Sequence, residues 1–458
     1  MLKTFRIYQT NDIHSHFRHW PQIAAYFKDA RHRTELLGED MLQFDIGDHL
    51  DRFHPMTEGT NGQGNVRLLN ALDYDAVTIG NNEGITLSNA QLDHLYDEAD
   101  FSVLVANLFD QSGKRPTGMK PYNLFSLENG LTVAAIGLTV PFVTFYEPLG
   151  WQVQNPFELL PDLIAEVREQ ADVVVLLSHL GYTRDQQIAR EIEGIDIILG
   201  AHTHHLLKQG VNVKGTTILQ AGKFGDYIGE MKVTFDTESG QVVSCEANSV
   251  SIGQYREDPD TKVLLDQLMA EGIEELQIPV AELKEPLSVS WFESSKFAEL
   301  LAEALREWCK ADIGMVNAGV LLESLPAGKV TKRDLHRVCP HPINPCKITL
   351  TGSELREVIR QSATEEMEKK EIKGLGFRGK VLGTMVYDGV HVEYVDGKVR
   401  KVRVGAEPLD PKREYEVATL DMYTFGMIFP GFAEKEKQYF LPEMLRDLLA
   451  WKLSNSQR

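Results

Sequence analysis

Apolar and polar residues alternate in two patterns along the first half of the chain. Short apolar runs of strand length are separated by longer segments in which apolar residues recur every three or four positions, as on one face of a helix. The runs predicted to be strands are residues 2–8, 41–46, 75–79, 101–105, 131–136, 173–177, 195–199, 217–220 and 230–235. The segments predicted to be helices are residues 65–73, 88–99, 156–170 and 184–193. Strands that alternate with helices in this way are typical of a layered α/β domain.

The rhythm changes between residues 248 and 260, where the strand pattern stops. The second half predicts helices at residues 261–276 and 297–308, a strand at 348–350, and strands at 390–395 and 399–404. Thr351-Gly352-Ser353-Glu354 is a capping-box sequence that opens a helix, and Asp396-Gly397 favours a tight hairpin turn. We therefore expect an α/β domain at residues 1–250, a connector helix at 251–280 and an α+β domain at 281–458.

Composition limits the classes of partner and compartment. With 47 basic and 67 acidic residues the 458-residue chain has a net charge of −20, which disfavours a nucleic-acid polymer or an anionic membrane as partner. A small phosphate ester is compatible with this charge, because a bound metal supplies local positive charge. No apolar stretch reaches the ~18 residues of a membrane helix, and no signal-peptide pattern follows Met1. The four cysteines form no Cys-x-x-Cys pair, as in reduced proteins, and we expect a cytoplasmic location.

Metal-ligand residue types follow five of the predicted strands. They are Asp12 and His14, Asp48, Asn81, His179, and His202 with His204. Each alone has a common alternative, since Gly-Asp is usually a turn and a histidine after a strand is usually a surface residue. Together they predict one site, because ligands gather at the carboxyl edge of an α/β sheet. Carboxylate and imidazole ligands suit Mn²⁺, Zn²⁺ or iron, and seven ligands favour two divalent ions about 3.5–4 Å apart with Asp48 as the bridge.

Five ordered blocks resemble those of the calcineurin-like metallophosphoesterases. The blocks are Thr10-Asn11-Asp12-x-His14, Gly47-Asp48, Gly80-Asn81-x-Glu83, Ser178-His179 and Gly200-x-His202-x-His204. The sequence around these blocks is similar to the 5′-nucleotidase/UDP-sugar hydrolase family and to its YunD-like cytosolic branch. Residues 283–440 resemble that family's C-terminal nucleotide-recognition domain. The resemblance implies a four-layer metallophosphoesterase β-sandwich with flanking helices, followed by an α+β C-terminal domain.

The same resemblance implies a division of the ligands and a reaction. One ion would be held by Asp12, His14, Asp48 and His204, and the other by Asp48, Asn81, His179 and His202. Water activated by the two ions would attack phosphorus in line, so that no side-chain nucleophile is needed. The implied activity is a two-metal phosphohydrolase acting on a small phosphate ester, with a 5′-nucleotide as the family default.

The third block departs from the family pattern, which has Gly-Asn-His-Glu and an Asp three residues after the His. Here Asn82 and Ile85 stand at those positions. Asn82 can donate a hydrogen bond but cannot carry positive charge, and loss of one such group typically costs about 10²–10³ in rate. We expect Asn82 to keep a catalytic role. Of the nearby histidines His16, His49 and His205, each of which is ordinarily a solvated surface residue, we favour His16 as the substitute.

The C-terminal half departs as well. Leu322 stands where the family has an arginine that helps to hold the substrate, and Glu299 stands where it has another arginine. The substrate-contact candidates come from a Pro-Phe-x-Asn-like stretch and from aromatic residues that resemble a base clamp; they are His341, Asn344, Phe429 and Phe432. An aromatic cluster is more often part of a core than of a clamp, so the preference for a nucleoside is left open.

Three functions follow from these patterns. The first is the phosphohydrolase, for which a cyclic nucleotide, nucleotide anhydride or nucleotide sugar would tolerate the missing His–Asp pair better than a monoester. The second is a non-catalytic or weakly active nucleotide- or metal-binding protein, and the third is a scaffold with vestigial ligands. Retention of all seven ligands favours the enzyme.

Overall fold

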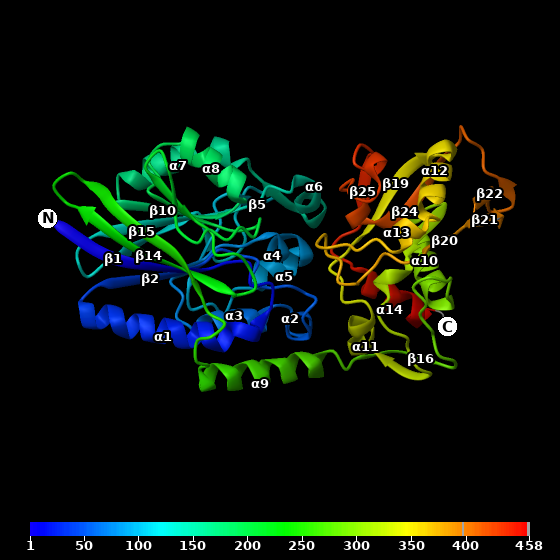
Figure 1. Cartoon of the computed structure of the whole chain (residues 1–458), viewed down its shortest axis with the longest axis horizontal. Helices are drawn as coiled ribbons and strands as arrows, with labels where there is room; N and C mark the ends of the chain where they lie inside the picture. The colour runs from blue at the N-terminus through cyan, green and yellow to red at the C-terminus, as the bar shows by residue number, and fades with distance from the viewer. Residues whose placement is uncertain (396–397, 456–458) are drawn as a thin grey trace. The chain divides into compact units, whose positions relative to one another are not determined.

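The structure is a computed structural model that describes residues 1–395 and 398–455. These residues divide into two compact units, Met1–Gly272 and a second unit that begins at Ile273. None of the described helices combines the length and the apolar character that a membrane crossing requires. Figure 1 follows the chain through both units.

Two sheets pack face to face in the first unit (Figure 1). The seven-stranded sheet runs in the order β15 (Gln241–Ser251), β14 (Tyr227–Asp236), β1 (Leu2–Thr10), β2 (Asp40–Asp45), β3 (Ala76–Val77), β4 (Ser102–Leu104), β6 (Met119–Lys120). The six-stranded sheet runs in the order β12 (Val211–Val213), β13 (Thr216–Leu219), β11 (Ile197–Gly200), β10 (Val173–His179), β8 (Thr132–Thr139), β7 (Tyr122–Ser126). Apolar side chains from both sheets fill the space between them, among them Phe5, Phe44, Val133, Val175 and Met231.

Helices cover the outer faces of this sandwich. Figure 1 shows α1 (Trp20–Leu37) and α3 (Gln63–Asn70) beside the seven-stranded sheet. Helices α7 (Pro156–Arg168) and α8 (Tyr182–Glu191) pack on the six-stranded sheet through a second apolar cluster. Shorter elements complete the unit: α2 (Pro55–Gly59), α4 (Asn81–Thr86), α5 (Asn89–His94), α6 (Val143–Tyr146), and the paired strands β5 (Leu108–Asp110) and β9 (Trp151–Val153). The helix–sheet–sheet–helix order confirms the predicted four-layer α/β fold.

Among the elements of the first unit that the sequence-based prediction lacks, two are long: helix α1 and strand β15. In α1 the consecutive residues Ile23, Ala24, Ala25, Tyr26 and Phe27 are all buried, so the start of the helix has no polar face and no helical rhythm. Strand β15 is an edge strand that is largely exposed, so it lacks the apolar alternation of a half-buried strand. It ends at Ser251 and therefore overlaps the start of the predicted boundary at 248–260.

Parallel pairing brings the ligand-bearing strand ends together. β1, β2 and β3 run parallel in one sheet, and β8, β10, β11 and β13 run parallel in the other. Asp12, Asp48 and Asn81 follow strands of the first sheet, whereas His179 and His202 come from the end of β10 and the residues after β11 in the second. The expectation of one sheet edge is therefore corrected: two packed sheets present their carboxyl ends to one place.

Helix α9 (Pro259–Glu275) confirms the helix predicted at residues 261–276. The limit between the two units falls inside it, after Gly272. Gly272 packs so closely on α2 that a Cβ there would lie 2.5 Å from the Cα of Met56. Most of this predicted connector thus belongs to the first unit.

The second unit is an α+β structure with its own core. Its five-stranded sheet has the order β20 (Met385–Asp388), β17 (Ile313–Asn317), β24 (Glu414–Leu420), β19 (Pro345–Thr351), β25 (Lys437–Tyr439). The smaller sheets contain β16 (Pro279–Leu283) with β18 (Gly328–Thr331), and β21 (Val390–Val395) with β22 (Lys398–Val404) and β23 (Glu407–Pro408). The helices are α10 (Lys296–Cys309), α11 (Lys332–Val338), α12 (Gly352–Ser362), α13 (Glu365–Glu368) and α14 (Leu445–Asn455).

The structure confirms the predicted capping box and the predicted strand pair of this unit. Thr351 and Glu354 form the predicted capping box at the start of α12. Strands β21 and β22 pair antiparallel as predicted for a hairpin, while its predicted turn, Asp396-Gly397, lies outside the described residues.

Candidate metal centre

Five predicted ligands adopt a left-handed backbone conformation. The φ angles are 50° at Asp12, 49° at His14, 52° at Asp48, 73° at His202 and 56° at His204. A positive φ is uncommon for residues other than glycine, and such strain concentrates where function requires it. Each of these residues follows a strand end, so the strained backbone turns the chain sharply there.

Backbone hydrogen bonds join the first two ligand loops. The amide of Asp12 donates to the carbonyl oxygen of Gly47 over 3.1 Å, and the amide of His14 donates to that of Asp48 over 2.7 Å. Gly47 has a φ of 82°, and a Cβ on it would stand 2.3 Å from the backbone nitrogen of Gly80. Glycine is therefore required at residue 47 both by the turn and by the third loop beside it.

Glu83 holds the second and third loops in place. Its carboxylate accepts from three backbone amides, those of Asp48 and Leu50 over 3.0 Å each and that of Gly80 over 2.8 Å. The side chain is buried, so these bonds replace its contact with water. Our prediction placed Glu83 in the third block without giving it a role; its three partners are distant in sequence or are backbone groups, which a sequence pattern does not reveal.

Six of the seven predicted ligand side chains gather into two clusters. Asp12, His14 and His204 form one, Asp48, His179 and His202 form the other, and within each cluster the candidate ligand atoms lie within 4.8 Å of one another. Asp48 Oδ2 lies between them, 3.6 Å from His14 Nε2 and 3.4 Å from His179 Nε2.

Two buried atoms at this site lack a hydrogen-bond partner among the described residues. They are Nε2 of His179 and Oδ1 of Asn81. The opposite nitrogen of the His179 ring, Nδ1, donates to the carbonyl oxygen of Ile46 over 2.6 Å, so Nε2 is the nitrogen that faces Asp48 and the site. Buried polar atoms are normally paired, and a divalent cation is a partner that would satisfy both. The residues present therefore fit the group that the resemblance implies.

The electrostatics also suit a cation. Burial lowers the pKa of His202 to about 4 and that of His204 to about 3, so both rings are neutral near pH 7 and can offer a lone pair. Although burial opposes its charge, the neighbouring His179 holds the pKa of Asp48 below its usual range. Against the effect of burial, the carboxylates of Asp48 and Asp12 raise the pKa of His179 to about 10, so a bound cation would take the place of the proton on its Nε2 atom. Carboxylate oxygens and imidazole nitrogens are donors that Mn²⁺ and Zn²⁺ bind in proteins.

The two predicted catalytic residues lie in different surroundings. Asn82 is buried at the start of α4, and its side-chain nitrogen lies 2.6 Å from His14 Nδ1. The ring of His16 is half-buried and packs on Phe224, with ring centroids 3.8 Å apart, and on Phe53 at 5.0 Å. Asn82 is thus in direct contact with the predicted ligand His14, whereas His16 packs on two aromatic rings.

The four predicted substrate contacts are buried in the second unit. His341 lies 2.8 Å from the carbonyl oxygen of Val320 through Nε2, and Asn344 donates to the carbonyl oxygen of residue 443 over the same distance. Phe429 and Phe432 are 2% and 1% exposed within the core. Their contact with a nucleotide stays a prediction, which this burial does not support.

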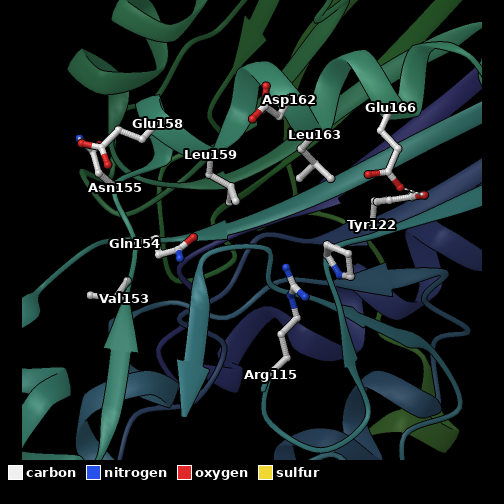
Figure 2. A pocket seen from close by; sticks show the side chains of 11 residues that line it. Arg115, Tyr122, Val153, Gln154, Asn155, Glu158, Leu159, Asp162, Leu163 and Glu166 are labelled. Carbon is white, nitrogen blue, oxygen red and sulfur yellow. Dashed lines mark hydrogen bonds between the residues drawn. The ribbon is translucent and has the colours of Figure 1, made fainter. Parts of the chain in front are cut away.

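A separate cavity of about 780 Å³ lies in the first unit between α7 and β7 (Figure 2). Arg115 points into it, and its Nε and Nη2 groups donate to two backbone carbonyl oxygens. Glu158, Asp162 and Glu166 line the α7 side, and Glu166 accepts from the Tyr122 hydroxyl over 2.8 Å. The residues that line this cavity include none of the predicted metal ligands.

Known proteins match both units. Residues 5–206 match the family model of the calcineurin-like phosphoesterases, and residues 279–432 match that of the 5′-nucleotidase C-terminal domain. The metallophosphoesterase YunD of Bacillus subtilis (strain 168) is 49% identical over 461 aligned positions, which cover 99% of this chain and 100% of YunD.

More distant proteins are similar over most of the chain. The 5′-nucleotidase of Vibrio cholerae serotype O1 is 24% identical, with 89% of this chain and 82% of that protein covered. The NAD nucleotidase structure from Haemophilus influenzae superposes with a TM-score of 0.70 at 16% identity, covering 99% of this chain and 97% of that one. At this identity the superposition shows a shared fold.

Proposed function

Because the chain belongs to the calcineurin-like phosphoesterases that carry a 5′-nucleotidase C-terminal domain, we propose that it hydrolyses small phosphate esters with two divalent cations. Its membership makes it a metal-dependent phosphoester hydrolase; the number of ions, their ligands and the substrate are our proposal. The observation that carries the proposal is the pair of three-residue His/Asp clusters, one of which contains Asp48.

We assign the ligands as follows. The first ion is bound by Asp12, His14, Asp48 and His204, and the second by Asp48, Asn81, His179 and His202. Asp48 Oδ2 supports the bridging role, since it lies within 3.6 Å of an imidazole nitrogen in each cluster. The unpaired Oδ1 of Asn81 supports the place of this amide among the ligands. The mixture of oxygen and nitrogen donors favours Mn²⁺ or Zn²⁺.

When bound, the two ions supply Lewis acidity and a water molecule of lowered pKa. The chain's own residues hold the geometry: Glu83 fixes the loop of Asp48, and His179 is oriented by its bond to the backbone of Ile46, the residue after β2. Asn82 stands at the position where the family has a histidine, which can donate a proton to the leaving group. An amide side chain cannot donate a proton in this way at neutral pH. Substrates with a good leaving group are therefore favoured over simple monoesters.

A nucleotide is the first substrate class to test. The match to a 5′-nucleotidase C-terminal domain and the likeness to the Vibrio cholerae 5′-nucleotidase support it. Nucleotide anhydrides, cyclic nucleotides and nucleotide sugars follow from the leaving-group argument. The cytoplasmic location stays a prediction from the sequence.

The test is hydrolysis by the full chain after chelation and reloading with Mn²⁺ or Zn²⁺. We expect metal-dependent phosphate release from at least one of AMP, ADP, cyclic AMP, UDP-glucose and bis(p-nitrophenyl) phosphate. The Asp48→Asn variant should lose at least about 10²-fold in kcat/KM, because it removes the charge shared by both ions, whereas Asp97→Asn, a change on the surface, should leave the rate unaltered. Equal rates for Asp48→Asn and the parent would contradict the proposal.

A binding protein without catalysis is the second candidate. It is favoured by Asn82 and Ile85, which replace the family's His–Asp pair. Calorimetry distinguishes the two candidates, since a sensor would bind AMP in the presence of Mn²⁺ and leave it unhydrolysed during the titration.

A further inference from the structure

The imidazole of His14 has two sides with different surroundings. Its Nε2 atom faces the ligand clusters, 3.1 Å from His204 Nε2 and 3.6 Å from Asp48 Oδ2. Its Nδ1 atom faces away from them, 2.6 Å from the side-chain amide of Asn82 and 3.7 Å from Asp51 Oδ2. A cation bound between the clustered groups would therefore meet Nε2.

This geometry dictates where the ring proton sits. A neutral imidazole binds a cation through the nitrogen that has a free lone pair, so the proton of His14 has to be on Nδ1. The Nδ1–H group then needs an acceptor at the position that Asn82 occupies. An amide has the same shape in both orientations, and with its oxygen towards His14 it accepts this hydrogen.

Asn82 is held in place for such a contact. The residue is 8% exposed, and its backbone amide donates to Asp48 Oδ1 over 2.8 Å. Asn82 thus contacts two of the proposed ligands, Asp48 through its backbone and His14 through its side chain. Asp51 is also fixed, because its Oδ1 accepts from the amide of Phe53 over 3.1 Å.

We propose that Asn82 is a positioning residue of the metal centre: its amide oxygen accepts the Nδ1–H of His14 and aims Nε2 at the cation, with the carboxylate of Asp51 behind the same ring. This inference rests on the proposed metal centre and replaces the catalytic hydrogen bond predicted from the sequence. The partner that a ligating histidine binds with its other nitrogen sets the tautomer and the ring orientation, and its loss typically weakens metal binding 10–100-fold.

Metal affinity tests the proposal without a substrate. The chelated full-length protein is titrated with Mn²⁺ by calorimetry. We expect Asn82→Ala to weaken one of the two bound equivalents about 10–100-fold and to leave the other unchanged. Asn82→Asp keeps an acceptor oxygen at the same reach and is expected to bind both equivalents at least as tightly as the parent. The titration contains no phosphate ester, so failure of the hydrolytic proposal would not alter its outcome.

Asn89→Asp on α5 is the matched control, since it makes the same change at an exposed position; both equivalents should bind as in the parent. Unfolding of each chelated variant shows whether it is folded, and Asn82→Thr, whose side chain is too short to reach His14, replaces Asn82→Ala if the latter does not fold. Parent-like binding by Asn82→Ala would overturn the proposal. So would equal weakening by Asn82→Asp and Asn82→Ala, because the amide nitrogen would then be the atom that matters.

Discussion

Gly80 lies directly against the carboxylate of Asp48: a Cβ on residue 80 would stand 2.1 Å from Asp48 Oδ1 and 2.6 Å from the Asp48 backbone nitrogen. Its φ of −96° is accessible to any residue, so the need for glycine comes from this close approach. The carboxylate that we assign to both ions is thus packed against the backbone of the third loop.

The substitution Gly80→Ala is therefore expected to displace Asp48 and to weaken both ions together. We expect Mn²⁺-dependent hydrolysis to fall by at least about 10²-fold, since a displacement of about 1 Å at a reacting centre costs this much. Gly431→Ala is the control, because a Cβ there meets nothing within 4 Å. Kinetics and metal content are measured on the same preparations, and full metal content with full activity in Gly80→Ala would contradict the packing argument.

Glu83→Gln is expected to destabilise the first unit. A glutamine has one acceptor oxygen and a donor group, so at least one of the buried amides of Asp48, Leu50 and Gly80 loses its partner. An unsatisfied buried donor costs about 1–3 kcal/mol, and the free energy of unfolding in urea measures the loss. Glu271→Gln breaks an exposed pair with Arg67 and should cost less than about 1 kcal/mol. A smaller loss in Glu83→Gln than in Glu271→Gln would refute the role of the Glu83 carboxylate.

Binding of metal should stabilise the first unit through mass action. At a free Mn²⁺ concentration of 100 times Kd, each site adds about 2.7 kcal/mol to the free energy of unfolding. His179→Gln removes the unpaired Nε2 atom and is expected to abolish the contribution of the second ion. His205→Gln, at an exposed position beside the ligand His204, should retain the full stabilisation. Thermal unfolding with Mn²⁺ and with a chelator measures the difference, and an undiminished Mn²⁺ effect in His179→Gln would remove this residue from the ligand set.

The buried His341 predicts a pH dependence of the second unit's stability. Burial lowers the pKa of His341 to about 3, whereas an unfolded histidine titrates near 6.5. The unfolded chain therefore binds a proton at His341 more tightly than the folded chain does. The stability that comes from the neutral, buried His341 is complete above pH 6.5 and is lost as the pH falls towards 3. Its slope is at most about 1.4 kcal/mol per pH unit.

Urea unfolding of chelated protein at several pH values between 7 and 4 measures this slope. His341→Gln should flatten it, and His391→Gln, a change on the exposed strand β21, should not. A slope that is the same in the parent and in His341→Gln would show that His341 is reached by water, and would restore it as a candidate substrate contact.

Local patterns were sufficient for part of the fold. The buried run of β10 and the capping box at Thr351 depend on residues close in sequence, so the prediction and the structure agree there. Helix α1 was missed because its buried residues are consecutive, and only the sheet and helices around it explain why all of them are covered.

For the metal centre too, some features could be predicted from the sequence and others could not. The chemical types of the ligands and their order along the chain can be read from the sequence, because each follows a strand end. The two-sheet origin of the site, the turn of His14 towards Asn82, the three amides on Glu83 and the burial of Phe429 and Phe432 depend on contacts between residues far apart in the chain. Side-chain direction and solvent exposure are set by packing across the folded chain, and no spacing within one segment encodes them.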